Sequence, residues 1–217
     1  MSQPSAEQTS HGVERRGSIV LFDGFEALDA FGPADLIGHV PSWQVEYVGV
    51  HPERSPVRSA QGFSVIPTAS LDDLRASTVV DILLVPGGPG TRLLVNNDHT
   101  LQAIAALGER ASVVSSVCTG AALLARAGLL DHLKATSNKM ALDWVSSQSS
   151  LVDWQTSARW VVDANRWTSS GVAAGMDMTY ALIAHYAGEY AAATAARCLE
   201  LNVQRDPLHD PFSAEHG

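Results

Sequence analysis

Short runs of apolar, β-branched residues recur along this chain, and segments with helical character separate most of them. The clearest runs are Ser18–Phe22, Trp43–Val50, Val79–Val85 and Ala111–Val117. Strands that are apolar on both faces are typical of parallel sheets covered by helices on both sides. The sequence therefore predicts an α/β fold with a mostly parallel central sheet, in which ligands bind at the carboxyl ends of the strands.

The ends of the chain are more polar than its centre. We expect three parts, namely a disordered N-terminal tail over residues 1–16, one domain over 17–203, and a C-terminal tail or cap over 204–217. Inside the domain, the helix after the first strand should break at Gly32-Pro33, because proline favours the first turn of a helix. Further along, we expect a hairpin near residues 160–168 and one or two alanine-rich helices over 173–203.

Charge and cysteine usage exclude several classes of protein. The chain has 14 basic and 23 acidic residues, with a net charge of −9. Nucleic-acid binding requires clustered cations, which this sequence lacks, so nucleic acid is not an expected partner. The N-terminus has no apolar signal-like core, and no apolar run is long enough to span a bilayer. With only two cysteines, we expect a soluble protein of the reducing cytoplasm, without a membrane partner.

The segment around Cys118 has the spacing of a nucleophile on a sharp turn between a strand and a helix. Such a turn needs small residues two positions before and after the nucleophile, and Ser116 and Gly120 meet this need. The positive end of the helix dipole should make the Cys118 thiol more acidic than a free cysteine. The alternative is a buried structural cysteine at a strand end.

Two further segments should reach the same edge of the sheet. The glycine-rich turn after Val79–Val85 could let the amides of Gly88 and Thr119 stabilise a developing anion, although a plain turn would also fit. Asp29, after the first strand, could exchange a proton with the thiol, because two adjacent negative charges raise one pKa. A capping or solvated aspartate is the alternative for Asp29, and Glu26 is expected to be a turn residue.

Histidine and the second cysteine add no site to this prediction. Thr119 follows Cys118, so the sequence has no adjacent Cys-His pair, and the eight histidines show no metal-binding spacing. We therefore expect neither a metal nor another cofactor. Cys198 lies in an alanine-rich helical segment and is expected to be packed there.

Several of these motifs together resemble one known superfamily. The motifs are DGFEALDAFGP, LLVPGGPG, SVCTGA, LLARAGLLDHLKAT and TSSGVAAGMDM, and they occur in this order between about residues 17 and 203. In order and spacing they resemble the ThiJ/PfpI superfamily. The resemblance implies a flavodoxin-like three-layer sandwich with a cysteine nucleophile elbow, and usually a homodimer.

Within that superfamily, Asp29 and the Thr119 that follows the cysteine are most similar to the isonitrile hydratase group. The resemblance implies that Cys118 is the nucleophile, Asp29 the acid and base, and Thr119 a hydroxyl that holds substrate or water. It also implies four substrate-binding residues, Gly87, Gly88, Ser137 and Asn138. One departure is Ser137-Asn138-Lys139, where close relatives often have Thr-His-Trp.

The activity implied by this resemblance is the hydration of a small isonitrile to an N-substituted formamide through a cysteine thioimidate. Two alternatives stay open. A glyoxalase III-like enzyme on the same scaffold also needs a thiolate and a carboxylate, but should have a histidine beside the cysteine. A ligand sensor, as in some AraC-type regulators, or a redox sensor would need no turnover.

Overall fold

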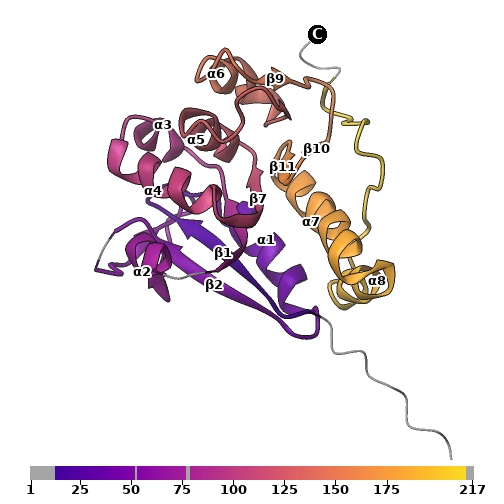
Figure 1. Cartoon of the computed structure of the whole chain (residues 1–217). Coiled ribbons are helices and arrows are strands. Elements are labelled where there is room, and N and C mark those ends of the chain that lie inside the picture. Colours follow the sequence, from indigo (N-terminus) through magenta and orange to yellow (C-terminus); the bar gives the residue numbers. More distant parts are fainter. Residues whose placement is uncertain (1–12, 52, 77–78, 214–217) are drawn as a thin grey trace, which may run out of the picture.

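The computed structural model describes residues 13–51, 53–76 and 79–213, and a seven-stranded sheet forms its centre (Figure 1). The strands, in spatial order, are β10 (Trp160–Asp163), β11 (Arg166–Ser169), β7 (Ala111–Val117), β6 (Val80–Val85), β1 (Arg15–Leu21), β2 (Trp43–Gly49) and β5 (Ala69–Ser70). Neighbouring strands are parallel except for the hairpin β10–β11. The predicted mostly parallel sheet and the predicted hairpin are both confirmed.

Helices cover both faces of this sheet and make three layers. The helices are α1 (Ala27–Gly38), α2 (Leu71–Ala76), α3 (Thr91–Leu94), α4 (Asp98–Gly108), α5 (Gly120–Arg126), α6 (Leu142–Ser146), α7 (Val172–Ala187) and α8 (Glu189–Cys198), with a short 3₁₀ turn, η1, at Lys139–Ala141. Helices α1, α7 and α8 pack together on one face, and α2, α4 and α5 on the other. This is the flavodoxin-like α/β arrangement that the sequence predicts.

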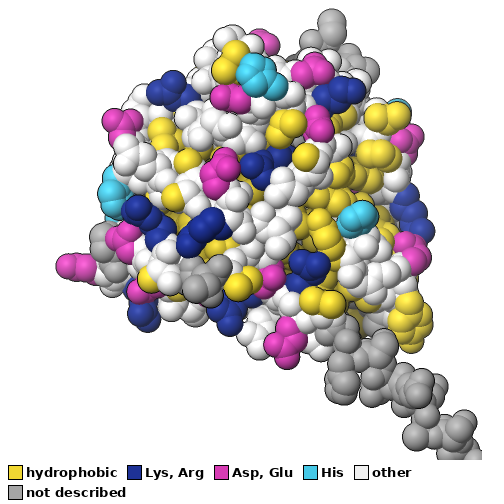
Figure 2. Space-filling model, viewed as in Figure 1, with side chains coloured by type: hydrophobic (Ala, Val, Ile, Leu, Met, Phe, Trp, Pro, Cys, Tyr) yellow, Lys and Arg dark blue, Asp and Glu magenta, His cyan; other side chains and the backbone are white. Residues whose placement is uncertain are grey.

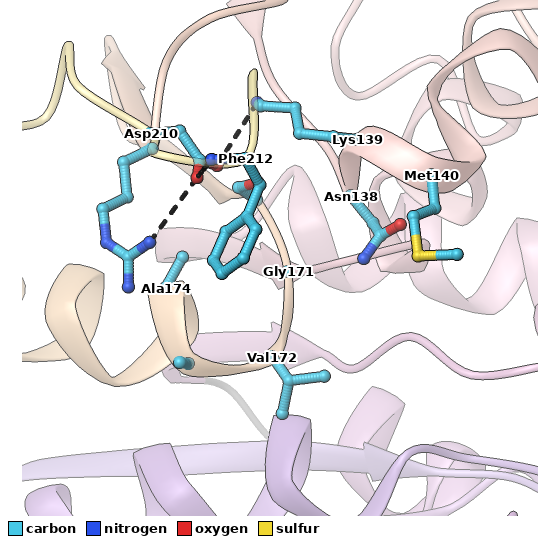
Figure 3. Close-up of a pocket in the computed structure, with 11 residues that line it drawn as sticks. Asn138, Lys139, Met140, Gly171, Val172, Ala174, Asp210 and Phe212 are labelled. Carbon is cyan, nitrogen blue, oxygen red and sulfur yellow. Dashed lines mark hydrogen bonds and ion pairs between the residues drawn. The ribbon is translucent and has the colours of Figure 1, made fainter. Parts of the chain in front are cut away.

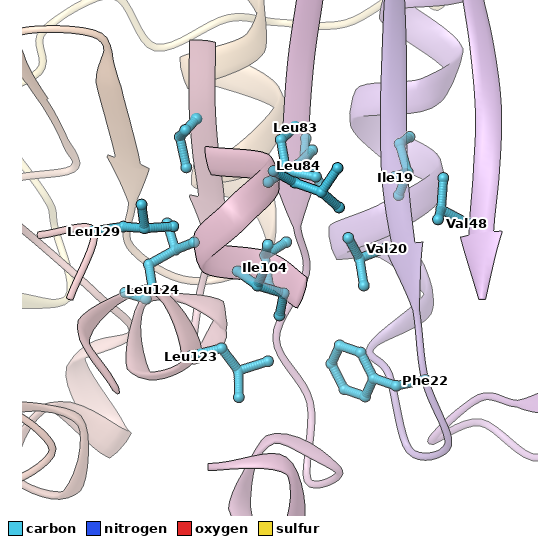
Figure 4. Packing of buried hydrophobic residues seen from close by; sticks show 14 of the residues in the cluster. Ile19, Val20, Phe22, Val48, Leu83, Leu84, Ile104, Leu123, Leu124 and Leu129 are labelled. Carbon is cyan, nitrogen blue, oxygen red and sulfur yellow. The ribbon is translucent and has the colours of Figure 1, made fainter. Parts of the chain in front are cut away.

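Each face of the sheet has its own apolar core, because adjacent strand residues point to opposite sides. On β7, Val113 belongs to the core beneath α1 and α7, whereas Val114 belongs to the core beneath α4 and α5. Figure 4 shows this second core, where Ile104 and Leu123 point towards the strands. Burial on both faces explains why strands such as β6 are mostly apolar.

Two pairs of short strands lie outside the central sheet. The antiparallel pair is β3 (Val57–Arg58) with β4 (Ser64–Val65), and the parallel pair is β8 (Lys134–Ala135) with β9 (Asp153–Trp154). Strand β8 follows α5 and ends at Ala135. The residues directly after Ala135 border the site described below.

The predicted break at Gly32-Pro33 is wrong, because α1 continues through Pro33. Proline at this position removes only the amide that would bond the carbonyl of Asp29, four residues earlier. The helix packs closely on α7 at this point, since a Cβ on Gly32 would lie 2.8 Å from Cγ of Met176. Packing against α7 therefore holds α1 together where its hydrogen-bond ladder is interrupted.

The structure also changes the expected boundaries. Strand β1 begins at Arg15, two residues before the expected domain start, and residues 1–12 of the expected tail lie outside the described residues. At the other end, residues 204–213 pack on the domain. The amide of Gln204 donates to Asp177 at 2.9 Å, the amide of Arg159 donates to Pro207 at 2.8 Å, and Asp210 is buried. This part is a cap.

No helix in the described ranges is long and apolar enough to cross a membrane. On the face shown in Figure 2, Lys and Arg side chains are interspersed with Asp and Glu side chains.

Candidate active site

Loops at the carboxyl ends of β1, β6 and β7 meet at one edge of the sheet. The amide of Glu26, after β1, donates to the carbonyl of Gly87, after β6, at 2.8 Å. The amide of Gly87 in turn donates to Oδ2 of Asp29 at 2.8 Å. These backbone contacts bring Asp29 to the turn that carries Cys118, although the two residues are far apart in sequence.

Cys118 is held in an unusual backbone conformation by its neighbours. Its φ of 56° is in the left-handed region, which a residue with a Cβ occupies only at a cost in free energy. Its amide donates to the carbonyl of Ser170 at 2.9 Å, and its carbonyl accepts from Oγ of Ser137 at 2.8 Å. The helix that follows starts close to β6, since a Cβ on Gly120 would clash with the carbonyl oxygen of Val85. The conformation and the close approach are those expected of a nucleophile elbow.

The thiol of Cys118 is less acidic than the sequence predicts. Burial, and then the charge of Asp29, raise the pKa of Cys118 to about 12, although hydrogen bonds from the amide and hydroxyl of Thr119 lower it in part. The side chain is only 9% exposed. The predicted effect of the helix N-terminus is thus outweighed, because loss of water disfavours a thiolate more than one helix dipole favours it.

The carboxyl of Asp29 has a pKa close to neutrality. Burial raises its pKa, the hydrogen bond from the amide of Gly87 lowers it in part, and the charge of Glu26 adds a smaller increase, with a net value of about 7. Its side chain is fully buried, and its Oδ1 has no hydrogen-bond partner among the described residues. Oδ1 is therefore the atom at which this carboxyl can carry and exchange a proton.

Asp29 and Cys118 are coupled, and the coupling decides which form reacts. The negative charge of Asp29 raises the pKa of Cys118, so a proton on Asp29 removes the repulsion that disfavours the thiolate. The reactive pair is then a thiolate beside a protonated carboxyl, with one proton shared between the two groups. This arrangement supplies a nucleophile and a proton donor at the same place.

Gly87 separates Asp29 from Thr119, and its lack of a side chain allows them to approach. A Cβ at this position would lie 2.6 Å from the backbone nitrogen of Thr119 and 2.9 Å from Oδ2 of Asp29. Any larger residue would push the two apart. Gly87 therefore shapes the site through its backbone and its missing side chain.

The predicted anion-stabilising pair of amides is wrong in one member. The amide of Gly88 already donates to Oγ1 of Thr119 at 3.0 Å, so it is not available to a developing anion. Thr91, which was not predicted from the sequence, belongs to the same small network. The hydroxyl of Thr91 is buried and donates to the carbonyl of Gly88 at 2.8 Å. The only signal was its position directly after the glycine-rich turn.

Ser137 and Asn138 lie on the other side of the elbow. Ser137 bonds the carbonyl of Cys118, so it supports the turn from behind. Asn138 accepts a hydrogen bond from the amide of Ala141 at 3.2 Å and lines a cavity of about 310 Å³. Neither Cys118 nor Asp29 is among the residues that line this cavity, but Ser170, which bonds the amide of Cys118, is one of them.

The remaining sequence predictions concern metals and the second cysteine. Within the described ranges, no group of three or more His, Cys, Asp or Glu side chains could hold a metal ion. Cys198 lies at the end of α8 as expected, but it is exposed, so the prediction that it is packed is wrong. The small side chains of α8 pack through Ala192, Ala195 and Ala196 instead.

Comparisons with known proteins agree with this architecture. Over 196 residues the chain is 31% identical to isonitrile hydratase from Pseudomonas putida, and the aligned region covers 90% of this chain and 80% of that enzyme. It is 33% identical over 163 residues to the HTH-type transcriptional regulator GbdR from Pseudomonas aeruginosa, but covers only 42% of that regulator. The crystal structure of a ThiJ/PfpI family protein from Pseudomonas syringae superposes with a TM-score of 0.80, at 27% identity, over 94% of this chain and 83% of that one. Residues 15–185 match the DJ-1/PfpI family, and the chain belongs to that family.

Proposed function

We propose that this protein hydrates isonitriles to N-substituted formamides, with Cys118 as the nucleophile and Asp29 as the acid and base. The observation that carries the proposal is Oδ1 of Asp29. It is buried, has no partner among the described residues, and belongs to a carboxyl whose pKa burial raises to about 7. The similarity to an isonitrile hydratase over most of both chains supports the same activity.

The first half of the reaction joins the thiol and the isonitrile. The Cys118 thiolate adds to the terminal carbon of R–N≡C, and Asp29 delivers its proton to that carbon, which gives the thioimidate R–N=CH–S. The carbon–sulfur bond forms at the expense of one carbon–nitrogen π bond. Covalent attachment divides a difficult hydration into two easier steps.

The second half returns the enzyme to its starting state. Asp29, now a carboxylate, takes a proton from a water molecule as the oxygen attacks the same carbon. The second proton of that water passes from the new hydroxyl to the nitrogen, the carbon–sulfur bond breaks, and R–NH–CHO leaves together with a restored thiolate, while Asp29 keeps the first proton for the next turnover. The sum is one isonitrile and one water converted to one formamide. In this scheme Thr119, whose hydroxyl accepts a hydrogen bond from the amide of Gly88, orients the substrate or the water.

The direct test is turnover by the purified protein. We expect stoichiometric conversion of an alkyl isonitrile to its formamide, followed by proton NMR, and little or no conversion of methylglyoxal under the same conditions. Faster turnover of methylglyoxal would favour the glyoxalase alternative. Binding of isonitriles without turnover would favour a sensor, the role suggested by the similarity to a transcriptional regulator.

The family resemblance also supports a cytoplasmic homodimer without a cofactor, so the assayed protein should have the mass of two chains by light scattering.

The activity should depend on pH through the shared proton. We expect kcat/KM to rise through about pH 7 and to level off above it, because burial raises the pKa of Asp29 to about 7. Below this pH both Cys118 and Asp29 are protonated, and the pair must lose one proton before a thiolate exists. The rate should then fall about tenfold for each pH unit. A profile of kcat/KM from about pH 5 to about pH 9 measures this.

The isosteric variant Asp29→Asn is the control for this profile. It should be much slower and lack the inflection near neutral pH; an inflection that survives in it would assign the titration to another group.

The stability of the folded protein should depend on pH in the opposite sense to the activity. The pKa of Asp29 in the folded protein is above its ordinary value of 3.8, so its contribution to stability is fully present below about pH 4 and is lost as the pH rises through about 7. Thermal unfolding of the wild type and of Asp29→Asn, measured from about pH 4 to about pH 7, checks the direction of this pH dependence of stability.

A further inference from the structure

A cavity of about 310 Å³ lies beside the nucleophile elbow, between the start of α7, the turn η1 and the C-terminal cap (Figure 3). Its volume is at the lower limit for sites that bind small molecules. We infer that this cavity holds the apolar substituent R of the substrate R–N≡C, and that Phe212 and Met140 set the preferred size of R. The inference rests on the proposed function and deepens it.

The cavity shares its walls with the groups that hold Cys118. Ser170 lines it, and the carbonyl of Ser170 accepts the amide of Cys118 at 2.9 Å. Asn138 also lines it and directly follows Ser137, whose hydroxyl bonds the carbonyl of Cys118 at 2.8 Å. Ser170 and Ser137, whose hydrogen bonds hold the backbone of Cys118, therefore both lie in segments that enclose the cavity.

The side chains around the cavity select a neutral, apolar group. The apolar contributors are Met140, Val172, Ala173, Ala174 and Phe212. Figure 3 shows the ring of Phe212 on one side, Val172 on another, and Met140 near Asn138. Because Met140 is 86% and Phe212 57% exposed, both would lose contact with water when an apolar group enters, which favours its binding.

Three charged residues also line the cavity, but their charges are already balanced. Asp210 lies 3.7 Å from Lys139 and 3.7 Å from Arg159, the two ion pairs drawn as dashed lines in Figure 3. Arg159 also donates through Nε to Asp177 at 2.8 Å, and Lys139 donates to the carbonyl of Ala158 at 2.6 Å. A charged ligand would have to compete with these buried pairs, so a neutral one is favoured.

Asn138, which directly follows Ser137, provides a polar group on the wall of the cavity. Its Oδ1 accepts the amide of Ala141, which orients the Nδ2 group towards Gly171: a Cβ on Gly171 would lie 3.2 Å from it. Nδ2 can therefore donate to the carbonyl oxygen of the formamide product. The ligand class is thus a compact alkyl or aryl isonitrile and its formamide.

The test compares a wall variant with a matched control from the same segment. In Phe212→Ala, the ratio of kcat/KM for benzyl isonitrile to that for methyl isonitrile should fall about tenfold, because one side of the cavity is lost. Leu208→Ala removes a 76% exposed apolar side chain of the cap that does not line the cavity, and should keep the wild-type ratio. Ala173→Leu, which adds volume at the start of α7, should lower the same ratio by about the same factor.

A second readout does not depend on turnover. Binding of N-benzylformamide to Cys118→Ala, measured by calorimetry, should weaken about tenfold when Phe212→Ala or Ala173→Leu is added. If the formamide binds and the variants weaken it, the cavity is assigned even where no isonitrile is hydrated, and only the proposed function fails. Unchanged ratios and unchanged affinities in both wall variants, or no binding of N-benzylformamide to the parent protein, would overturn the inference.

Discussion

Isonitrile hydration should fall by about a thousandfold or more when Cys118 is replaced by alanine. The proposed reaction has no other nucleophile at the sheet edge, and loss of the attacking group in covalent catalysis commonly costs several orders of magnitude in kcat. Alanine leaves the buried surroundings and the left-handed backbone in place, so the variant should fold. Initial rates of formamide formation by NMR, with circular dichroism to check folding, measure the effect.

Cys198→Ala is the matched control, because it removes the other thiol of the chain from an exposed position at the end of α8. It should retain the full rate. Equal rates in the wild type and in Cys118→Ala would remove the covalent scheme, whatever the substrate. A loss of activity in Cys198→Ala instead would show that the activity depends on the thiol of Cys198 and not on that of Cys118.

The largest loss of stability should follow from Asp210→Ala. Asp210 is 2% exposed and forms ion pairs with both Lys139 and Arg159. Removal of one partner from a buried ion pair leaves a charge without compensation, which costs about 3–5 kcal/mol. The free energy of unfolding, measured by urea denaturation, should fall by about this amount, and the C-terminal cap should become sensitive to proteases.

Asp206→Ala provides the comparison, because Asp206 lies in the same cap and is exposed. Surface substitutions of this kind change stability by about 0.5 kcal/mol or less. If the two variants lost the same stability, the ion pairs of Asp210 would not be what holds the cap. A smaller loss in Asp210→Asn than in Asp210→Ala would show that polar contacts retain part of the effect.

The sequence predicts the sheet well because burial leaves a direct trace in composition. Strands β6 and β7 are buried on both faces along most of their length, and apolar residues accordingly predominate in them, with Asp81 and three serines as the exceptions. The elbow is also predictable, since a left-handed nucleophile and a tight helix start require small neighbours. Gly120 lies so close to the backbone of β6 that a Cβ at this position would clash with the carbonyl oxygen of Val85.

The acidity of the Cys118 thiol was not predictable, because it depends on which atoms the fold buries together. A helix N-terminus can be seen in the sequence, but the burial of Cys118 and its distance from a second charge cannot. The same holds for the amide of Gly88, which an unforeseen contact with Thr119 occupies. Likewise Pro33 reads as a helix break locally, and only packing against α7 overrides it.

The C-terminal segment could not be identified from the sequence as a cap rather than a tail, for a related reason. Its sequence is polar and rich in proline, which is typical of segments that stay in water. Asp210 is buried only because Lys139 and Arg159, on two different and much earlier segments, meet it there. Such a constellation of charges has no local pattern.

The position of Asp210 near the end of the described chain also bears on how the protein is made. A ribosome releases the nucleophile elbow and the whole central sheet before it releases Asp210, at about 5–20 residues per second. During that interval the nascent chain has Lys139 in place without its ion-pair partner Asp210, whereas Arg159 can already pair with Asp177. The wall of the cavity is thus completed by a segment that is synthesised after the whole sheet, and until then the ammonium of Lys139 has no carboxylate to balance it.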